Sequence, residues 1–115
     1  MRYLLMVCRD ERAFEALGPD EVSALEAEFA AYNEELTRRG VMLGGERLRR
    51  TSDATSVQVR EGEVLVADGP FAETKEQIGG YCLVECRDLD EAIEVAARVP
   101  VARMGTIEVR PIWER

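Results

Sequence analysis

Residues 68–81 carry the run Asp68-Gly69-Pro70-Phe71-Ala72-Glu73-Thr74-Lys75-Glu76-Gln77, followed by Gly79-Gly80-Tyr81. The Gly69-Pro70 pair is a turn signal, and a strand-like apolar run follows it. A simple hairpin needs only about two to five turn residues. This loop is longer and more polar than a connection requires, so it is a candidate for a role beyond joining two strands.

Strands and helices are predicted on both sides of this loop. Gly18-Pro19 opens a first helix that Gly40 closes, and Asp88 caps a second helix that ends at Pro100. The strand-like runs are Tyr3 to Cys8, Val41 to Leu43, Ser56 to Arg60, Glu63 to Ala67, Tyr81 to Cys86 and Thr106 to Ile112. This order predicts an α+β, ferredoxin-like β-α-β-(β-hairpin)-β-α-β sandwich, with two helices on one face of an antiparallel sheet.

The first strand is apolar on both of its faces. In the predicted plan it lies at the centre, and we expect it to run parallel to the neighbouring Tyr81 strand. Two helices cover only one face of the sheet, and an exposed apolar face usually marks an interface. The sequence therefore predicts a homodimer through the uncovered face, with Tyr3, Leu5 and Leu83 among the residues that it buries.

The length, charge and hydropathy of the chain exclude some classes of function. The 115 residues are enough for one domain, spanning 1–115. The net charge of −8 argues against nucleic-acid binding, and only Arg47, Arg49 and Arg50 form a basic cluster. No apolar run reaches the ~20 residues of a membrane helix, and acidic residues follow the first strand at once. We therefore expect a cytoplasmic protein that binds no membrane.

The chain has no histidine and three cysteines, Cys8, Cys82 and Cys86. Without imidazole, the usual zinc and iron ligand sets and His-dependent catalysis are excluded. Cys82 and Cys86 lie about 13 Å apart on a strand at ~3.3 Å per residue, so they cannot bind one metal together. We expect packed thiols, no cofactor, no metal and no required disulfide. Cys8 and Cys86 are expected near the C-terminal ends of adjacent parallel strands, on the same face.

The polar loop is the first group of candidate ligand-binding residues. It contributes Asp68, Glu73, Lys75 and Gln77. A structural interpretation stands beside this one. Asp68 could cap the turn, and Glu73 and Gln77 could form an i,i+4 pair on a short helical turn. Phe71 is expected to anchor the loop in apolar surroundings.

The uncovered face of the sheet supplies the second group of candidates. If Ile107 and Val109 face the helices, alternation places four other side chains on that uncovered face. They are Tyr81, Glu85, Glu108 and Arg110. The carboxylates and the arginine either satisfy one another as ion pairs or line a cavity. In a cavity, a carboxylate with a raised pKa could act as acid or base.

The loop, together with Gly79-Gly80-Tyr81, resembles the signature of the YCII-related, DGPF-type family. The resemblance continues along almost the whole chain, through Gly40-Val41-Met42-Leu43-Gly44-Gly45-Glu46, Asp88-Leu89-Asp90-Glu91-Ala92 and Ile107-Glu108-Val109-Arg110-Pro111-Ile112. It implies a ferredoxin-like fold of the dimeric α/β-barrel superfamily. It also implies a regulatory context, since DGPF-type proteins are often encoded beside extracytoplasmic-function sigma factors.

The resemblance implies less about chemistry. Some YCII-related proteins carry a His on the first helix and an Asp before the proline after the second helix, proposed as an acid–base dyad. This chain has Tyr32, Asn33 and Glu34 on its first helix and Val99 before Pro100, so the dyad does not carry over. Our leading hypothesis is a small-molecule-binding or accessory module without an assigned reaction. The alternatives are a metal-free enzyme using carboxylate and tyrosine acid–base chemistry on a small organic substrate, and a protein-interaction module acting with a sigma factor.

Overall fold

Four strands form the central sheet of the computed structural model, which describes residues 1–114. They are β1 (Arg2–Arg9), β2 (Met42–Arg47), β5 (Gln77–Glu85) and β6 (Thr106–Pro111), in the spatial order β2-β5-β1-β6. All neighbouring pairs are antiparallel. The prediction of an α+β fold with an antiparallel sheet is confirmed, and the arrangement is compatible with a ferredoxin-like plan.

The expectation that β1 and β5 run parallel is wrong. Their register is antiparallel, with Leu4 opposite Leu83 and Met6 opposite Tyr81. The chain leaves β1, crosses along the first long helix and enters β2 in the same direction as β1. β5 then inserts between β1 and β2 and runs against both of them.

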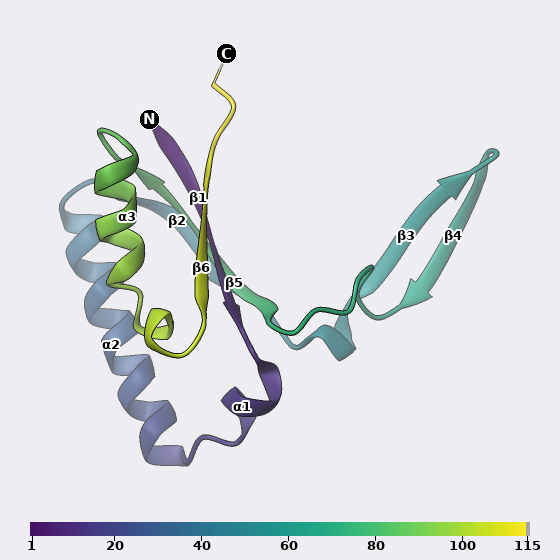
Figure 1. The fold of residues 1–115 in the computed structure, drawn as a ribbon, viewed down its shortest axis with the longest axis horizontal. Coiled ribbons are helices and arrows are strands. Elements are labelled where there is room, and N and C mark those ends of the chain that lie inside the picture. The colour runs from purple at the N-terminus through teal and green to yellow at the C-terminus, as the bar shows by residue number, and fades with distance from the viewer. Residues whose placement is uncertain (115) are drawn as a thin grey trace.

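Two helices cover one face of the sheet, as Figure 1 shows. They are α2 (Pro19–Arg38) and α3 (Leu89–Ala97). Pro19 stands at the first turn of α2, where its missing N–H costs nothing. The Asp88 side chain caps α3 by accepting a hydrogen bond from the Glu91 amide at 3.0 Å, as predicted. A short helix missed by the sequence patterns, α1 (Glu11–Glu15), follows β1 and is capped by Asp10.

The hydrophobic core lies between this helical layer and the sheet. Small residues on α3, Ala92 and Ala96, allow the helix to approach closely, and the Tyr32 hydroxyl of α2 donates a hydrogen bond to the Val95 carbonyl of α3 at 2.9 Å. The sheet contributes the buried side chains of Tyr3, Leu5, Val7, Cys82 and Val84, and the buried Cys86 follows directly after β5. Tyr3 and Leu5 therefore belong to the core, and their predicted place in a dimer interface is wrong.

The opposite face of the sheet has no covering element among residues 1–114. We call it the open face and define it by Leu4, Met6, Cys8, Tyr81, Leu83, Glu85, Glu108 and Arg110, which alternate with the buried positions. Leu4, Met6, Cys8 and Leu83 are only partly exposed. The open face is thus apolar at its centre and charged towards the β6 edge.

A two-stranded hairpin stands away from the rest of the molecule (Figure 1). It is formed by β3 (Thr55–Arg60) and β4 (Glu63–Asp68), which pair only with each other. We call this hairpin the arm. It gives the molecule a radius of gyration of 16.0 Å, against about 13 Å for a compact domain of this length. One side of the arm is a ladder of valines between 59% and 66% exposed: Val57, Val59, Val64 and Val66.

The chain returns from the arm to the sheet through residues 69–76, which form neither helix nor strand. The possible helical turn joining Glu73 to Gln77 is therefore absent from this segment. Phe71 is 82% exposed, so the expectation that it anchors the loop in apolar surroundings is wrong for this chain. The anchor is Gln77 instead. Its side chain accepts a hydrogen bond from the Glu11 amide at 2.9 Å and donates one to the Thr74 carbonyl at 2.6 Å.

No helix within residues 1–114 is both long enough and apolar enough to cross a bilayer.

Candidate functional site

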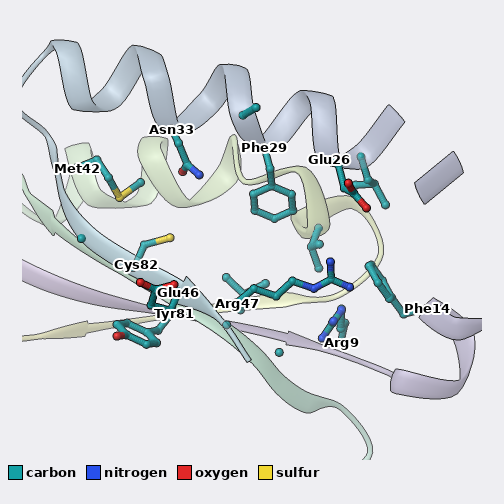
Figure 2. Close-up of a pocket in the computed structure, with 18 of the residues that line it drawn as sticks. Arg9, Phe14, Glu26, Phe29, Asn33, Met42, Glu46, Arg47, Tyr81 and Cys82 are labelled. Carbon is teal, nitrogen blue, oxygen red and sulfur yellow. The ribbon is translucent and has the colours of Figure 1, made fainter. Parts of the chain in front are cut away.

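A cavity of about 570 Å³ lies between α2 and the β2–β5 side of the sheet. Helix α2 presents Val22, Leu25 and Phe29 to it, and the sheet presents Val7 and Cys82. Figure 2 shows the side chains of Phe29 and Asn33 projecting from α2 towards the strands. The cavity is within the usual range of small-molecule sites, about 300–1,000 Å³, and has the usual composition of an apolar lining with a few polar groups.

Two arginines and a phenylalanine form one end of the cavity. Arg9 comes from the last residue of β1, Arg47 from the last residue of β2, and Phe14 from α1. The Arg9 Cζ lies 4.0 Å from the centroid of the Phe14 ring, and the Arg47 Cζ lies 5.7 Å from it. Both distances are within the reach of a cation–π interaction. Burial lowers the pKa of the Arg9 guanidinium, and the neighbouring positive charge of Arg47 lowers it further.

A β-bulge in β5 makes room for the Arg9 guanidinium. Val7 is opposite Gly80 and Cys8 is opposite Ile78, so Gly79 is an extra residue on its strand. A Cβ atom added at Gly79 would lie 1.5 Å from Arg9 Nη1, which means that only glycine leaves this space free. The Gly79-Gly80 pair of the sequence signature therefore has a physical role in shaping the cavity wall.

Of the sequence-predicted candidates, only Tyr81 borders the cavity. Its ring lies on the far side of the sheet from α2 (Figure 2), because its neighbour Cys82 points towards the helix. Asp68 is the last residue of β4, and Glu73 and Lys75 lie on the connection between the arm and β5; all three are exposed. Gln77 is held by the two hydrogen bonds described above. The structure thus does not bring the loop candidates together with the cavity.

The open face holds the remaining candidates, as alternation predicted. Glu108 and Arg110 form an ion pair with 2.6 Å between Arg110 Nη2 and Glu108 Oε2. Glu85 instead lies 2.6 Å from the amino group of Met1. Both pairs are substantially exposed, so they are surface ion pairs of small energetic weight rather than buried charges.

All three cysteines are free thiols. Cys82 and Cys86 are buried in the core, as predicted, and burial raises the pKa of the Cys82 thiol. The expectation that Cys8 and Cys86 lie close together on one face is wrong. In the antiparallel register Cys8 is opposite Ile78, whereas Cys86 lies at the other end of β1, where its amide bonds to the Met1 carbonyl. Within residues 1–114, no three His, Cys, Asp or Glu side chains converge as a metal site would require.

Sequence patterns missed Arg9, Phe14 and Arg47 as site residues. Arg47 was noticed only as part of a basic cluster, and Arg9 follows an apolar strand like any surface charge. The available signal was Gly79-Gly80, because two glycines within a strand often mark a bulge or a close approach of another group.

Comparison with known proteins supports the family resemblance. The family model for the YCII-related domain matches residues 1–115. The chain belongs to the YCII-related family. An uncharacterized protein of Rhizobium meliloti (strain 1021), R00369, is 34% identical over 114 residues, an alignment that covers 97% of this chain and 92% of the relative. The YCII-related chain described here thus has a relative similar over nearly its full length, but that relative's name assigns no reaction.

Proposed function

We propose that this YCII-related protein is a small-molecule-binding module and that its ligand occupies the cavity between α2 and the sheet. One observation carries the proposal: a cavity of about 570 Å³ with a mainly apolar lining and convergent polar groups at one end. We place the module in the cytoplasm. Action beside a sigma factor is a further proposal that rests on the family resemblance alone.

A pair of α2 substitutions tests whether the cavity binds small molecules. Ala30 lines the cavity, whereas Ala31 is exposed and does not line it. The neutral probe 2-naphthamide and the anionic probe 2-naphthoate are titrated while amide chemical shifts are followed by NMR. We expect saturable shifts at cavity residues such as Val22, Phe29 and Met42. Ala30→Trp should abolish them and Ala31→Trp should retain them. If neither probe produces saturable shifts there, the proposal fails.

We also propose that the functional unit is a homodimer. The centre of the open face is apolar, and the arm exposes a valine ladder that nothing in residues 1–114 covers. Apolar surfaces of this kind are typical of interfaces between protein chains. The open face and the cavity are on opposite sides of the sheet, so a dimer formed through the open face leaves the cavity accessible.

A further inference from the structure

Arg9 and Arg47 form no salt bridge within residues 1–114, although the more distant charges of Glu11 and Glu15 act on Arg9. Each of the two arginines approaches the Phe14 ring. The full sequence has 23 acidic and 15 basic residues. Arg12, Arg38 and Arg60 also lack a salt bridge among the described residues, but Arg9 and Arg47 differ from them because they line the cavity.

The nearby carboxylates are already occupied by other partners. Glu11 accepts hydrogen bonds from the Thr51 amide and hydroxyl, both at 2.8 Å. Glu15 pairs with Arg50 at 2.5 Å, and Asp53 pairs with Arg49 at 3.0 Å. The neighbouring arginines of the basic cluster are thus neutralised, and the two at the cavity are not.

One acidic side chain of α2, Glu26, lines the same end of the cavity. Figure 2 shows it on the helix side, across from Arg47 and Phe14. It is outside salt-bridge distance of both cavity arginines. This end of the cavity thus carries two arginines on the sheet side and one carboxylate on the helix side. Glu46 of β2 also lines the cavity, and most of the remaining lining is apolar.

Arg9, Phe14 and Arg47 also line a second, smaller cavity of about 310 Å³. Its other charged lining residues are Glu11, Glu15, Arg49 and Arg50. A ligand in the main cavity can reach the two guanidinium groups with one end while its body lies against Phe29 and Val22. A guanidinium fork matches the geometry of a carboxylate and binds it with charge-assisted hydrogen bonds.

We propose that the cavity selects organic carboxylates with a ring-sized apolar body, and that Arg9 and Arg47 hold the carboxylate against Phe14 while the body lies under α2. This inference rests on the proposed small-molecule function and adds the class of ligand. Gly79 is a positioning residue in this site, since its missing side chain leaves the space that the Arg9 guanidinium occupies.

The charge of the ligand is tested by comparing 2-naphthoate with 2-naphthamide, which has nearly the same shape and no charge. Dissociation constants are measured by isothermal titration calorimetry. A charge-assisted hydrogen bond contributes about 1.5–3 kcal/mol, so we expect naphthoate to bind at least about tenfold more tightly. Arg9→Gln and Arg47→Gln should each remove most of that preference. Arg60→Gln is the matched control, because Arg60 is an exposed arginine on the arm, far from the cavity lining.

Gly79→Ala provides a test that leaves the charge of the protein unchanged. The new Cβ would displace the Arg9 guanidinium, so naphthoate affinity should fall about as far as in Arg9→Gln while naphthamide affinity changes little. Circular dichroism checks that the variant is folded. Equal binding of the two probes to wild type, or unchanged naphthoate affinity in Arg9→Gln and Arg47→Gln, would overturn the carboxylate assignment while leaving small-molecule binding intact. If neither probe binds the wild-type protein, the proposed small-molecule function itself is overturned.

Discussion

At the residue scale, glycines decide how closely parts of this molecule approach each other. A Cβ at Gly45 would lie 2.5 Å from the Tyr81 carbonyl oxygen, and one at Gly105 would lie 2.2 Å from the Cys8 carbonyl oxygen. In both cases the obstacle is backbone, which cannot swing aside as the Arg9 side chain can beside Gly79. These positions keep the β2–β5 pairing and the approach to β6 at their observed spacing.

The adjacent glycines of β2 allow a controlled test of this role. We expect Gly45→Ala to lower the free energy of unfolding by about 1–3 kcal/mol, as overpacking usually does. Nothing lies within 4 Å of a Cβ at Gly44, so Gly44→Ala should stay within about 1 kcal/mol of wild type. Urea denaturation of the two variants measures the difference, and equal stabilities would show that the β2–β5 pairing tolerates the extra methyl group.

A buried tyrosine predicts how stability depends on pH. Burial raises the pKa of the Tyr32 hydroxyl well above its ordinary value, which is about 10. The folded state therefore keeps a proton that the unfolded state loses above about pH 10. Stability is fully present below that pH and falls as pH rises further, by about 1.4 kcal/mol per pH unit for one such group.

Tyr32→Phe separates this titration from the hydrogen bond to the Val95 carbonyl. At neutral pH the variant should lose about 0.5–1.5 kcal/mol, the usual contribution of one hydrogen bond. Above pH 10 its stability should fall less steeply than that of wild type. Urea denaturation across pH 7–11 provides the comparison, and parallel curves for the two proteins would exclude Tyr32 as the source of the alkaline loss.

At the element scale, the segment from the end of β4 to the start of β5 contains both residues that hold the fold and residues that are free to bind. Gln77 bridges the Glu11 amide and the Thr74 carbonyl. Asp68 and Glu73 are exposed, and no side-chain hydrogen bond or ion pair involves either of them in the portion of the chain covered by the structure. Lys75 is exposed as well and makes no such interaction within residues 1–114. Gln77 therefore has a structural role, whereas Asp68, Glu73 and Lys75 are available to a partner.

Substitutions in this segment should distinguish the residue that stabilises the fold from the residues that are available to a partner. We expect Asp68→Asn and Glu73→Gln to change stability by less than about 0.5 kcal/mol, as exposed substitutions usually do. Gln77→Ala, the matched structural control, should cost about 1 kcal/mol or more through its lost hydrogen bonds. Thermal melting curves check all three. A clear loss of stability in both Asp68→Asn and Glu73→Gln would show that the loop has a structural role, and it would contradict the prediction that the loop binds a ligand.

The elements themselves were largely predictable, because long apolar runs, turn glycines and helix caps agree along the sequence. α2 ends one residue before Arg39-Gly40, and the hairpin strands lie within a residue or two of their predicted bounds. α1 was not predicted, since five residues are too few to show helical periodicity. The site was missed for a different reason. Arg9, Phe14 and Arg47 come together only through the register of β1, β5 and β2, and the direction of β5 was predicted incorrectly.

At the scale of the whole molecule, the sheet divides a ligand-facing side from an open side. The helices and the cavity lie on the first, and Leu4, Met6 and Leu83 lie on the second. Alternation along β1 and β5 correctly predicted that two apolar faces exist. It could not tell which of them the helices cover, because both sets of side chains are apolar.

The open face predicts the behaviour of the protein in dilute solution. We expect a homodimer at micromolar concentration that buries more than about 1,000 Å² in total, the usual lower bound for a stable interface. Leu83→Asp should produce monomers by placing a charge opposite Leu4 at the centre of the open face. Ile93→Asp, at a half-exposed position on α3, serves as the control and should remain dimeric. Light scattering measures the mass, and a wild-type monomer at this concentration would contradict the prediction.

The central position of β1 determines when the sheet can form during synthesis of the chain. β1 precedes the other five strands in the sequence, yet within residues 1–114 it pairs only with β5 and β6, which begin at Gln77 and Thr106. Contacts between residues so distant in sequence form slowly, because a long loop must close before they can contribute. While the ribosome is still adding the arm, the apolar side chains of β1 have no strand to join. β1 can join a sheet only after β5 has emerged, so its apolar side chains depend on β5 and β6 for protection from aggregation during synthesis.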